Sequence, residues 1–206
     1  MRFGLLAVFV LSMAFAGSPM AAPITFSTVL TGPGEEPPNS STATAFGVVT
    51  IDPVAHILRV ETSFGGLTSG VTASHIHVIN GPNDPNTSDT TGPVATRTPT
   101  FLNFPSGVTF GGYNMQFNSL DAATYNNPSW ISASAALNPS LTPVQAAELE
   151  LFNGITSGRA YLNIHTTQFP NGEIRGFLEP VPEPATITGV AAALGLALLA
   201  RRRFKA

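Results

Sequence analysis

The feature that most constrains this chain is a two-residue period in its apolar side chains, which recurs between turn-forming residues. Short segments rich in β-branched residues stand at 24–30, 45–51 and 56–61, with Gly, Pro or Asp close to their ends. Successive side chains of a strand point to opposite faces, so a period of two predicts strands rather than helices. We therefore expect a β-rich, antiparallel domain.

Further segments extend this pattern along the chain. Five more candidate strands lie at residues 72–79, 113–117, 129–135, 159–166 and 173–179. The last two flank Phe169-Pro170-Asn171-Gly172, and Asn-Gly favours a tight hairpin turn. Helical spacing is found at 142–151, where Thr142 can cap a helix and Pro143 stands in its first turn. The pattern predicts an all-β antiparallel sandwich or barrel with one short crossover helix.

The start of the chain has the composition of an export signal. Arg2 precedes an apolar stretch at 3–15, and small residues follow at 14–16 and again at 20–22. This order is typical of a secretory signal peptide, which we assign to residues 1–22 with either group of small residues as the cleavage site. The alternative is an uncleaved membrane helix, which the short run and the Gly17-Ser18-Pro19 that follows it disfavour.

The end of the chain carries a second apolar segment. An almost unbroken run at 185–200 lies between Val181-Pro182-Glu183-Pro184 and Arg201-Arg202-Arg203. Three arginines cannot follow a helix into a protein core, so we expect a transmembrane helix with the arginines on the cytoplasmic side. This three-part order, at 181–206, resembles the PEP-CTERM sorting signal of exported bacterial proteins. The resemblance implies an exosortase as processing partner beside signal peptidase; an anchor that is never cut is the alternative.

The residues between these two ends are acidic and contain no cysteine. Residues 23–184 hold four arginines and no lysine against all twelve Asp and Glu, a net charge of −8. Such a surface repels phosphate, so nucleic acid is excluded as a partner. Without cysteine, neither disulfides nor thiolate chemistry is possible. About 155 residues can bury one core, which predicts a single domain at 23–180.

Candidate chemistry centres on three histidines. His75 and His77 stand two apart in an expected strand, so both imidazoles project from one face. His165 lies in another expected strand and is a possible third ligand. Three neutral histidines on adjacent strands suit zinc or copper, and an acidic domain attracts cations. The alternative is that these side chains only make structural hydrogen bonds. His56 has no partner nearby in the sequence and is expected to be an exposed turn residue.

Other catalytic patterns are weak. Glu173 and Arg175 share a strand face and could position an anion or a peptide carboxylate, although a structural ion pair is the more ordinary interpretation. Ser74 precedes His75 but lacks a Gly-x-Ser-x-Gly elbow, and no phosphate-binding glycine loop opens a helix. We therefore do not expect an enzyme, and a pair of glycosidase carboxylates is left open.

Several motifs taken together resemble one family. They stand at residues 30–32, 35–38, 47–52, 73–77, 160–166 and 169–176. This set resembles the CHRD domain, first described in chordin and common in exported bacterial proteins. The resemblance implies an immunoglobulin-like β-sandwich of unknown biochemical activity. One departure is that the glycine usually found soon after His-x-His is delayed to Gly81, where a long polar loop begins.

These observations predict a non-enzymatic, exported protein of the cell surface or extracellular matrix. Its role would be structural or binding, with the membrane and matrix polysaccharide as partners. The alternative is an extracytoplasmic protein that binds zinc or copper through His75, His77 and His165. A third class, a hydrolase acting on polysaccharide, would require two carboxylates that face each other across a groove.

Overall fold

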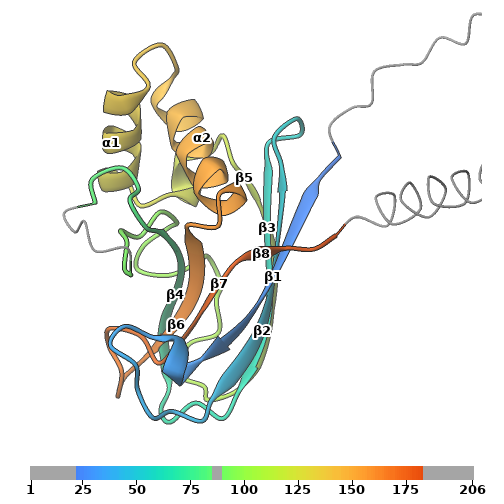
Figure 1. Ribbon diagram of the computed structural model, residues 1–206, viewed down its shortest axis with the longest axis vertical. Helices are drawn as coiled ribbons and strands as arrows, with labels where there is room; N and C mark the ends of the chain where they lie inside the picture. The colour runs from blue at the N-terminus through green and yellow to red at the C-terminus, as the bar shows by residue number, and fades with distance from the viewer. Residues whose placement is uncertain (1–21, 85–89, 183–206) are drawn as a thin grey trace, which may run out of the picture.

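The computed structural model describes residues 22–84 and 90–182 (Figure 1). The signal peptide predicted at 1–22, apart from Ala22, and the membrane segment predicted at 185–200 lie outside these residues, as do Glu183, Pro184 and the three terminal arginines. Both assignments therefore stay predictions. Within the described ranges, no helix has the length and apolar composition needed to span a bilayer.

The described residues form a mostly β structure with two α-helices. In chain order the elements are β1 (Ile24–Thr31), η1 (Gly32–Gly34), β2 (Thr44–Asp52), β3 (Ile57–Gly65), β4 (Val71–Val78), β5 (Gly111–Asn118), η2 (Ala122–Thr124), α1 (Ser129–Leu137), α2 (Pro143–Thr156), β6 (Ala160–Thr166), β7 (Ile174–Phe177) and β8 (Glu179–Pro180).

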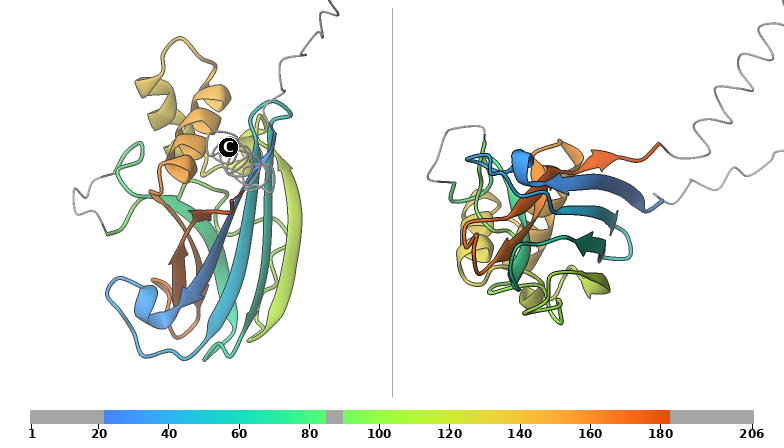
Figure 2. Two further views of the ribbon diagram at one scale, coloured as in Figure 1. Left: turned by 45° about the vertical axis from the view of Figure 1, so that its right-hand side comes forward. Right: turned by 90° about the horizontal axis from the view of Figure 1, so that it is seen from below.

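The strands make one antiparallel sheet that curls into a half-barrel (Figure 2). Their order is β4-β6-β7-β1-β2-β3-β5, and β8 pairs with β1. The expected antiparallel β fold is confirmed, but the two-layer sandwich is replaced by this single curled sheet. The reason lies at the junction of β7 with β1, where only Thr31 and Arg175 pair. A junction this narrow lets the sheet fold over on itself without splitting into two sheets.

A long loop closes the open side of the curl. The end strands β4 and β5 are consecutive in the chain, and in the connection between them Phe101 donates its N–H to Ser74 O in β4 at 3.2 Å. On the other side, Tyr113 in β5 donates its hydroxyl to Leu102 O at 2.8 Å. Phe101 and Phe104 are buried and pack against the Tyr113 ring. Because these rings cover the interior, the core does not need a second sheet.

The core fills the inside of the curl. It is built from one alternate set of side chains in each strand, and its fully buried members include Leu30, Ile51, Leu58, Ile76, Leu162, Ile164 and Ile174. Alternation therefore places the other set of side chains, the histidines among them, on the outer face of the sheet.

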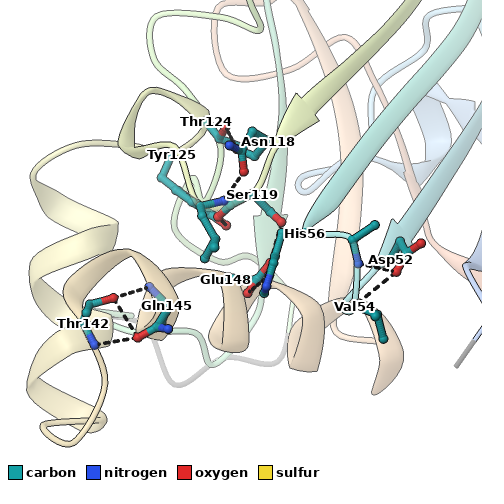
Figure 3. Close-up of polar contacts among 12 residues, drawn as sticks. Asp52, Val54, His56, Asn118, Ser119, Thr124, Tyr125, Thr142, Gln145 and Glu148 are labelled. Carbon is teal, nitrogen blue, oxygen red and sulfur yellow. Dashed lines mark hydrogen bonds and ion pairs between the residues drawn. The ribbon is translucent and has the colours of Figure 1, made fainter. Parts of the chain in front are cut away.

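The predicted helix at 142–151 is confirmed and is longer than expected, because α2 continues to Thr156. Thr142 and Gln145 form a capping box, in which each side chain bonds the backbone of the other residue (Figure 3). The strand predicted at 129–135 is wrong, since these residues form α1. Its buried Trp130, Ile131 and Ser134 have helical spacing, and Trp130 Nε1 donates to Ala147 O of α2 at 3.1 Å. Alternating Ser and Ala had produced a false period of two.

Candidate metal centre

The three candidate histidines lie on two neighbouring strands. In the register of β4 and β6, His75 is opposite Asn163, His77 is opposite Tyr161 and Ala73 is opposite His165. Ser74, Ile76 and Val78 are fully buried in the core, which leaves His75 and His77 on the other face of β4. The prediction that both imidazoles share one face is confirmed.

The three imidazoles converge over this face. One ring nitrogen from each of His75, His77 and His165 lies within 4.8 Å of the corresponding nitrogens of the other two. The ring centroids are 5.2 Å apart for His75 and His165, 5.8 Å for His75 and His77, and 6.2 Å for His77 and His165. Three residues up to 90 positions apart in the sequence are thus brought together.

Backbone carbonyls set the tautomer of each ring. The contacts are His75 Nε2 with Pro99 O at 2.8 Å, His77 Nδ1 with Gly92 O at 2.8 Å, and His165 Nδ1 with Pro170 O at 3.0 Å. A carbonyl oxygen only accepts, so in each pair the ring nitrogen must carry the hydrogen. The opposite nitrogen of each neutral ring then holds a lone pair. For His75 and His165, these are the two nitrogens that lie closest to each other.

The spacing of two of these nitrogens matches that of metal ligands. Nδ1 of His75 and Nε2 of His165 are 3.4 Å apart, although both carry lone pairs. Two ligands at the usual distance of about 2.0–2.1 Å from a tetrahedral zinc ion would be about 3.3–3.4 Å apart. Nε2 of His77 is buried and has no hydrogen-bond partner among the described residues. An ion between the rings would satisfy all three lone pairs.

Asn163 is the polar neighbour of this cluster. Its Nδ2 lies 2.9 Å from Nε2 of His165 and donates to that lone pair. Its Oδ1 is buried without a hydrogen-bond partner in the described part of the chain. A metal ion bound to His165 Nε2 would replace this donated bond, so the Asn163 amide would have to turn when an ion enters.

Burial keeps the histidines neutral. Burial, assisted by the nearby His165, lowers the pKa of His75 from its usual 6.5 to about 4. Burial also lowers the pKa of His77 to about 3, and it lowers the pKa of His165 as well. Metal ions bind the unprotonated imidazole, so at neutral pH the cluster needs to lose no proton before it binds.

Glu173 and Arg175 have separate partners. The Arg175 guanidinium lies over the Tyr161 ring at 4.7 Å, and that ring stacks on His77 at 4.8 Å. Nε of Arg175 donates to Gly34 O at 2.8 Å, and its nearest carboxylate is Glu35, at 3.9 Å. Arg175 therefore supports the wall beside His77.

The Glu173 carboxylate binds donors from three parts of the chain. It accepts hydrogen bonds from Ser41 Oγ at 2.7 Å, Thr166 Oγ1 at 2.6 Å, Thr68 N at 2.8 Å and Thr68 Oγ1 at 3.0 Å. Because Glu173 is fully buried, these bonds connect two loops to the end of β6. Its geometry is that of a structural group and offers no room for a ligand.

Sequence reasoning missed two further acidic groups. Glu35 is 6% exposed, and one of its oxygens has no hydrogen-bond partner among the described residues. Burial raises its pKa to about 7 despite the nearby Arg175.

The second acidic group is Glu148 of α2. His56, expected to be exposed and without a partner, does lie in a turn but contacts Glu148 at 2.9 Å. Nothing local marks that contact, because 92 positions separate the two residues.

Comparison with known families gives one match. The sequence profile of the CHRD domain matches residues 26–178. No curated protein and no solved structure is significantly similar to the chain. The matched range contains all three converging histidines and the loop residues whose carbonyls orient them.

Proposed function

The chain belongs to the CHRD domain family, and we propose that its domain binds one zinc or copper ion through His75, His77 and His165. The observation that carries this proposal is the convergence of three imidazoles, each of which donates one N–H to a backbone carbonyl. Metal-bound histidines usually donate their second N–H in this way, which fixes the tautomer and the direction of the ring.

The surroundings favour capture of a cation. Three histidines fill three positions of a tetrahedral site and leave a fourth for water or another ligand, as in open zinc sites. His165 is only partly buried, so the cluster borders solvent at this residue. The net charge of −8 over residues 23–184 raises the local concentration of cations. Bound zinc would supply Lewis-acid chemistry, and bound copper would add one-electron redox chemistry.

Metal content and metal-dependent melting test the proposal. The full-length chain would be compared with a His75→Ala/His77→Ala/His165→Ala variant and with His56→Asn, which removes a histidine outside the cluster. We expect one equivalent of zinc or copper in the parent and in His56→Asn, and none in the triple variant. At an ion concentration 1,000 times the Kd, binding should stabilise the parent by about 4 kcal/mol. Equal binding by parent and triple variant would reject the site and leave a displayed structural domain.

We further propose that this domain works outside the cytoplasm, at the cell surface or in the extracellular matrix. Support comes from the sequence alone: a signal-like start at 1–22, and the motif 181–184 followed by an apolar run and three arginines. Cell fractionation and the mass of the mature protein would test this. A mature chain that still contains Arg201-Arg202-Arg203 would reject processing by an exosortase.

A further inference from the structure

A second polar cluster lies far from the metal centre in sequence, at the turn between β2 and β3. His56 has φ = 55°, in the left-handed region, and its carbonyl accepts from Ser119 N at 2.9 Å. Its ring Nδ1 lies 2.9 and 3.1 Å from the two carboxylate oxygens of Glu148. Ser119 Oγ in turn donates to Glu148 at 2.5 Å, which closes a ring of hydrogen bonds among the three residues (Figure 3).

This closed network fixes the orientation of the His56 imidazole. A carboxylate accepts hydrogen bonds, so Nδ1 carries the hydrogen and Nε2 of the neutral ring holds the lone pair. Tyr125 steadies the network by donating its hydroxyl to Ser119 O at 2.6 Å. Among the described residues no hydrogen bond engages His56 Nε2, and the side chain is 40% exposed. An oriented acceptor is thus presented to solvent.

The acceptor borders an apolar groove. Between α2 and the ends of β1 and β2 lies an open groove of about 400 Å³, whose walls include both His56 and Glu148. Most of the lining is apolar: Ile24, Ile51, Pro53, Leu141, Leu149 and Phe152. Pockets that bind small organic molecules usually measure about 300–1,000 Å³ and combine apolar walls with a few placed polar groups.

The charges of the lining select the ligand. Among the described lining residues there is no lysine or arginine, and Glu148 is the one carboxylate. An anionic ligand would therefore meet a negative charge without a permanent cation to offset it. A cationic ligand would find both Glu148 oxygens already bonded and the side chain only 11% exposed. Ser119 cannot act as a nucleophile, because its hydroxyl is fully buried and donates to Glu148.

We propose that this groove binds a neutral, largely apolar molecule that donates one hydroxyl to Nε2 of His56. An alkylphenol or apolar alcohol has this chemistry: its hydrocarbon body covers the Leu149 wall, and its hydroxyl meets the oriented lone pair. The site is independent of the metal centre, since none of the three clustered histidines lines the groove.

Two matched probes and two matched variants test the inference. Full-length protein in lipid nanodiscs would be titrated at about pH 8 with 4-propylphenol and with its methyl ether, 4-propylanisole. The two probes share a body, and the ether lacks the donor. His56→Asn keeps the turn, because Asn tolerates a positive φ, but its shorter side chain cannot reach the ligand. Leu149→Glu places a charge on an exposed wall position of the groove.

We expect saturable shifts of the Leu149 methyl and His56 ring signals in NMR spectra. The phenol should bind at least about fivefold more tightly than the ether, the size of one net hydrogen bond. His56→Asn should remove this preference, so that the two probes bind it equally, whereas Leu149→Glu should weaken both probes. Equal affinities of the parent for the two probes would overturn the proposal. So would partition into the lipid without saturation at the groove.

Discussion

Two buried glutamates should respond in opposite directions to the same substitution. The Glu35 carboxylate is poorly supplied with hydrogen-bond donors. One oxygen has no hydrogen-bond partner among the described residues, and Nε of Arg175 is 3.9 Å from the other. Glu173 accepts four hydrogen bonds. A change from Glu to Gln removes the charge and nearly preserves the shape. It should therefore stabilise the fold at position 35 and destabilise it at position 173.

The magnitude at Glu35 follows from its pKa. Burial raises the pKa from 4.5 to about 7, so between these values the folded chain holds a proton that the unfolded chain releases. The stability present below about pH 4.5 is then lost as the pH rises through about 7. One pKa unit corresponds to about 1.4 kcal/mol, so ionised Glu35 costs about 3 kcal/mol in alkaline solution. Glu35→Gln should recover this amount at about pH 8.5 and change little at about pH 4.

At Glu173 the same substitution replaces one carboxylate oxygen with an NH₂ group that faces donors. At least one buried donor then loses its acceptor, which costs about 2 kcal/mol or more. The assay is urea unfolding of the full-length chain, followed by fluorescence of Trp130, the one tryptophan of the chain. If Glu35→Gln has the same effect at both pH values, or destabilises the protein at pH 8.5, the account of Glu35 is wrong.

Three further predictions use the same unfolding assay. Because burial lowers the pKa of His75 to about 4, the contribution of His75 to stability without metal should be complete above about pH 6.5 and fall by roughly 3 kcal/mol as the pH drops to about 4; His75→Asn should remove this part of the pH dependence. Thr142→Ala removes the cap of α2 and should cost about 1 kcal/mol at any pH, whereas Thr142→Ser should cost little. Gly172→Ala should destabilise by more than about 1 kcal/mol, because φ is 132° and a Cβ would lie 2.4 Å from Glu35 Oε1; no loss would show that this hairpin can adjust.

Local periodicity predicted much of the sheet and of the three-histidine cluster. The alternation of β4 and β6 was enough to put His75, His77 and His165 on outward positions, because strand geometry has a strict period of two. Local sequence also located α2, because Thr142 and Pro143 are residues typical of the start of a helix. Whether the three histidines hold a metal ion stays a prediction.

Features that depend on distant contacts were not predictable. The curl of the sheet depends on the single pair of Thr31 with Arg175 and on a loop that covers the interior, and neither leaves a periodic pattern. The pKa of Glu35 depends on burial by the hairpin at Gly172, more than 130 residues away. The strand prediction at α1 was wrong for another reason. Small residues that alternate in type are compatible with the period of a helix as well as with that of a strand.

The pairing of β8 with β1 determines how the domain would respond to tension. Val181 N donates to Thr25 O at 2.9 Å, and Phe26 lies opposite Pro180, so the described chain enters and leaves at the same end of one antiparallel pair. A force that separates these two points would load the hydrogen bonds one after another and peel β8 away like a zipper. If the force instead acted along the strands, the same few hydrogen bonds would bear it together. A domain attached through one terminus alone would therefore place no tension on the sheet, whereas a force applied between its two termini would first separate β8 from β1.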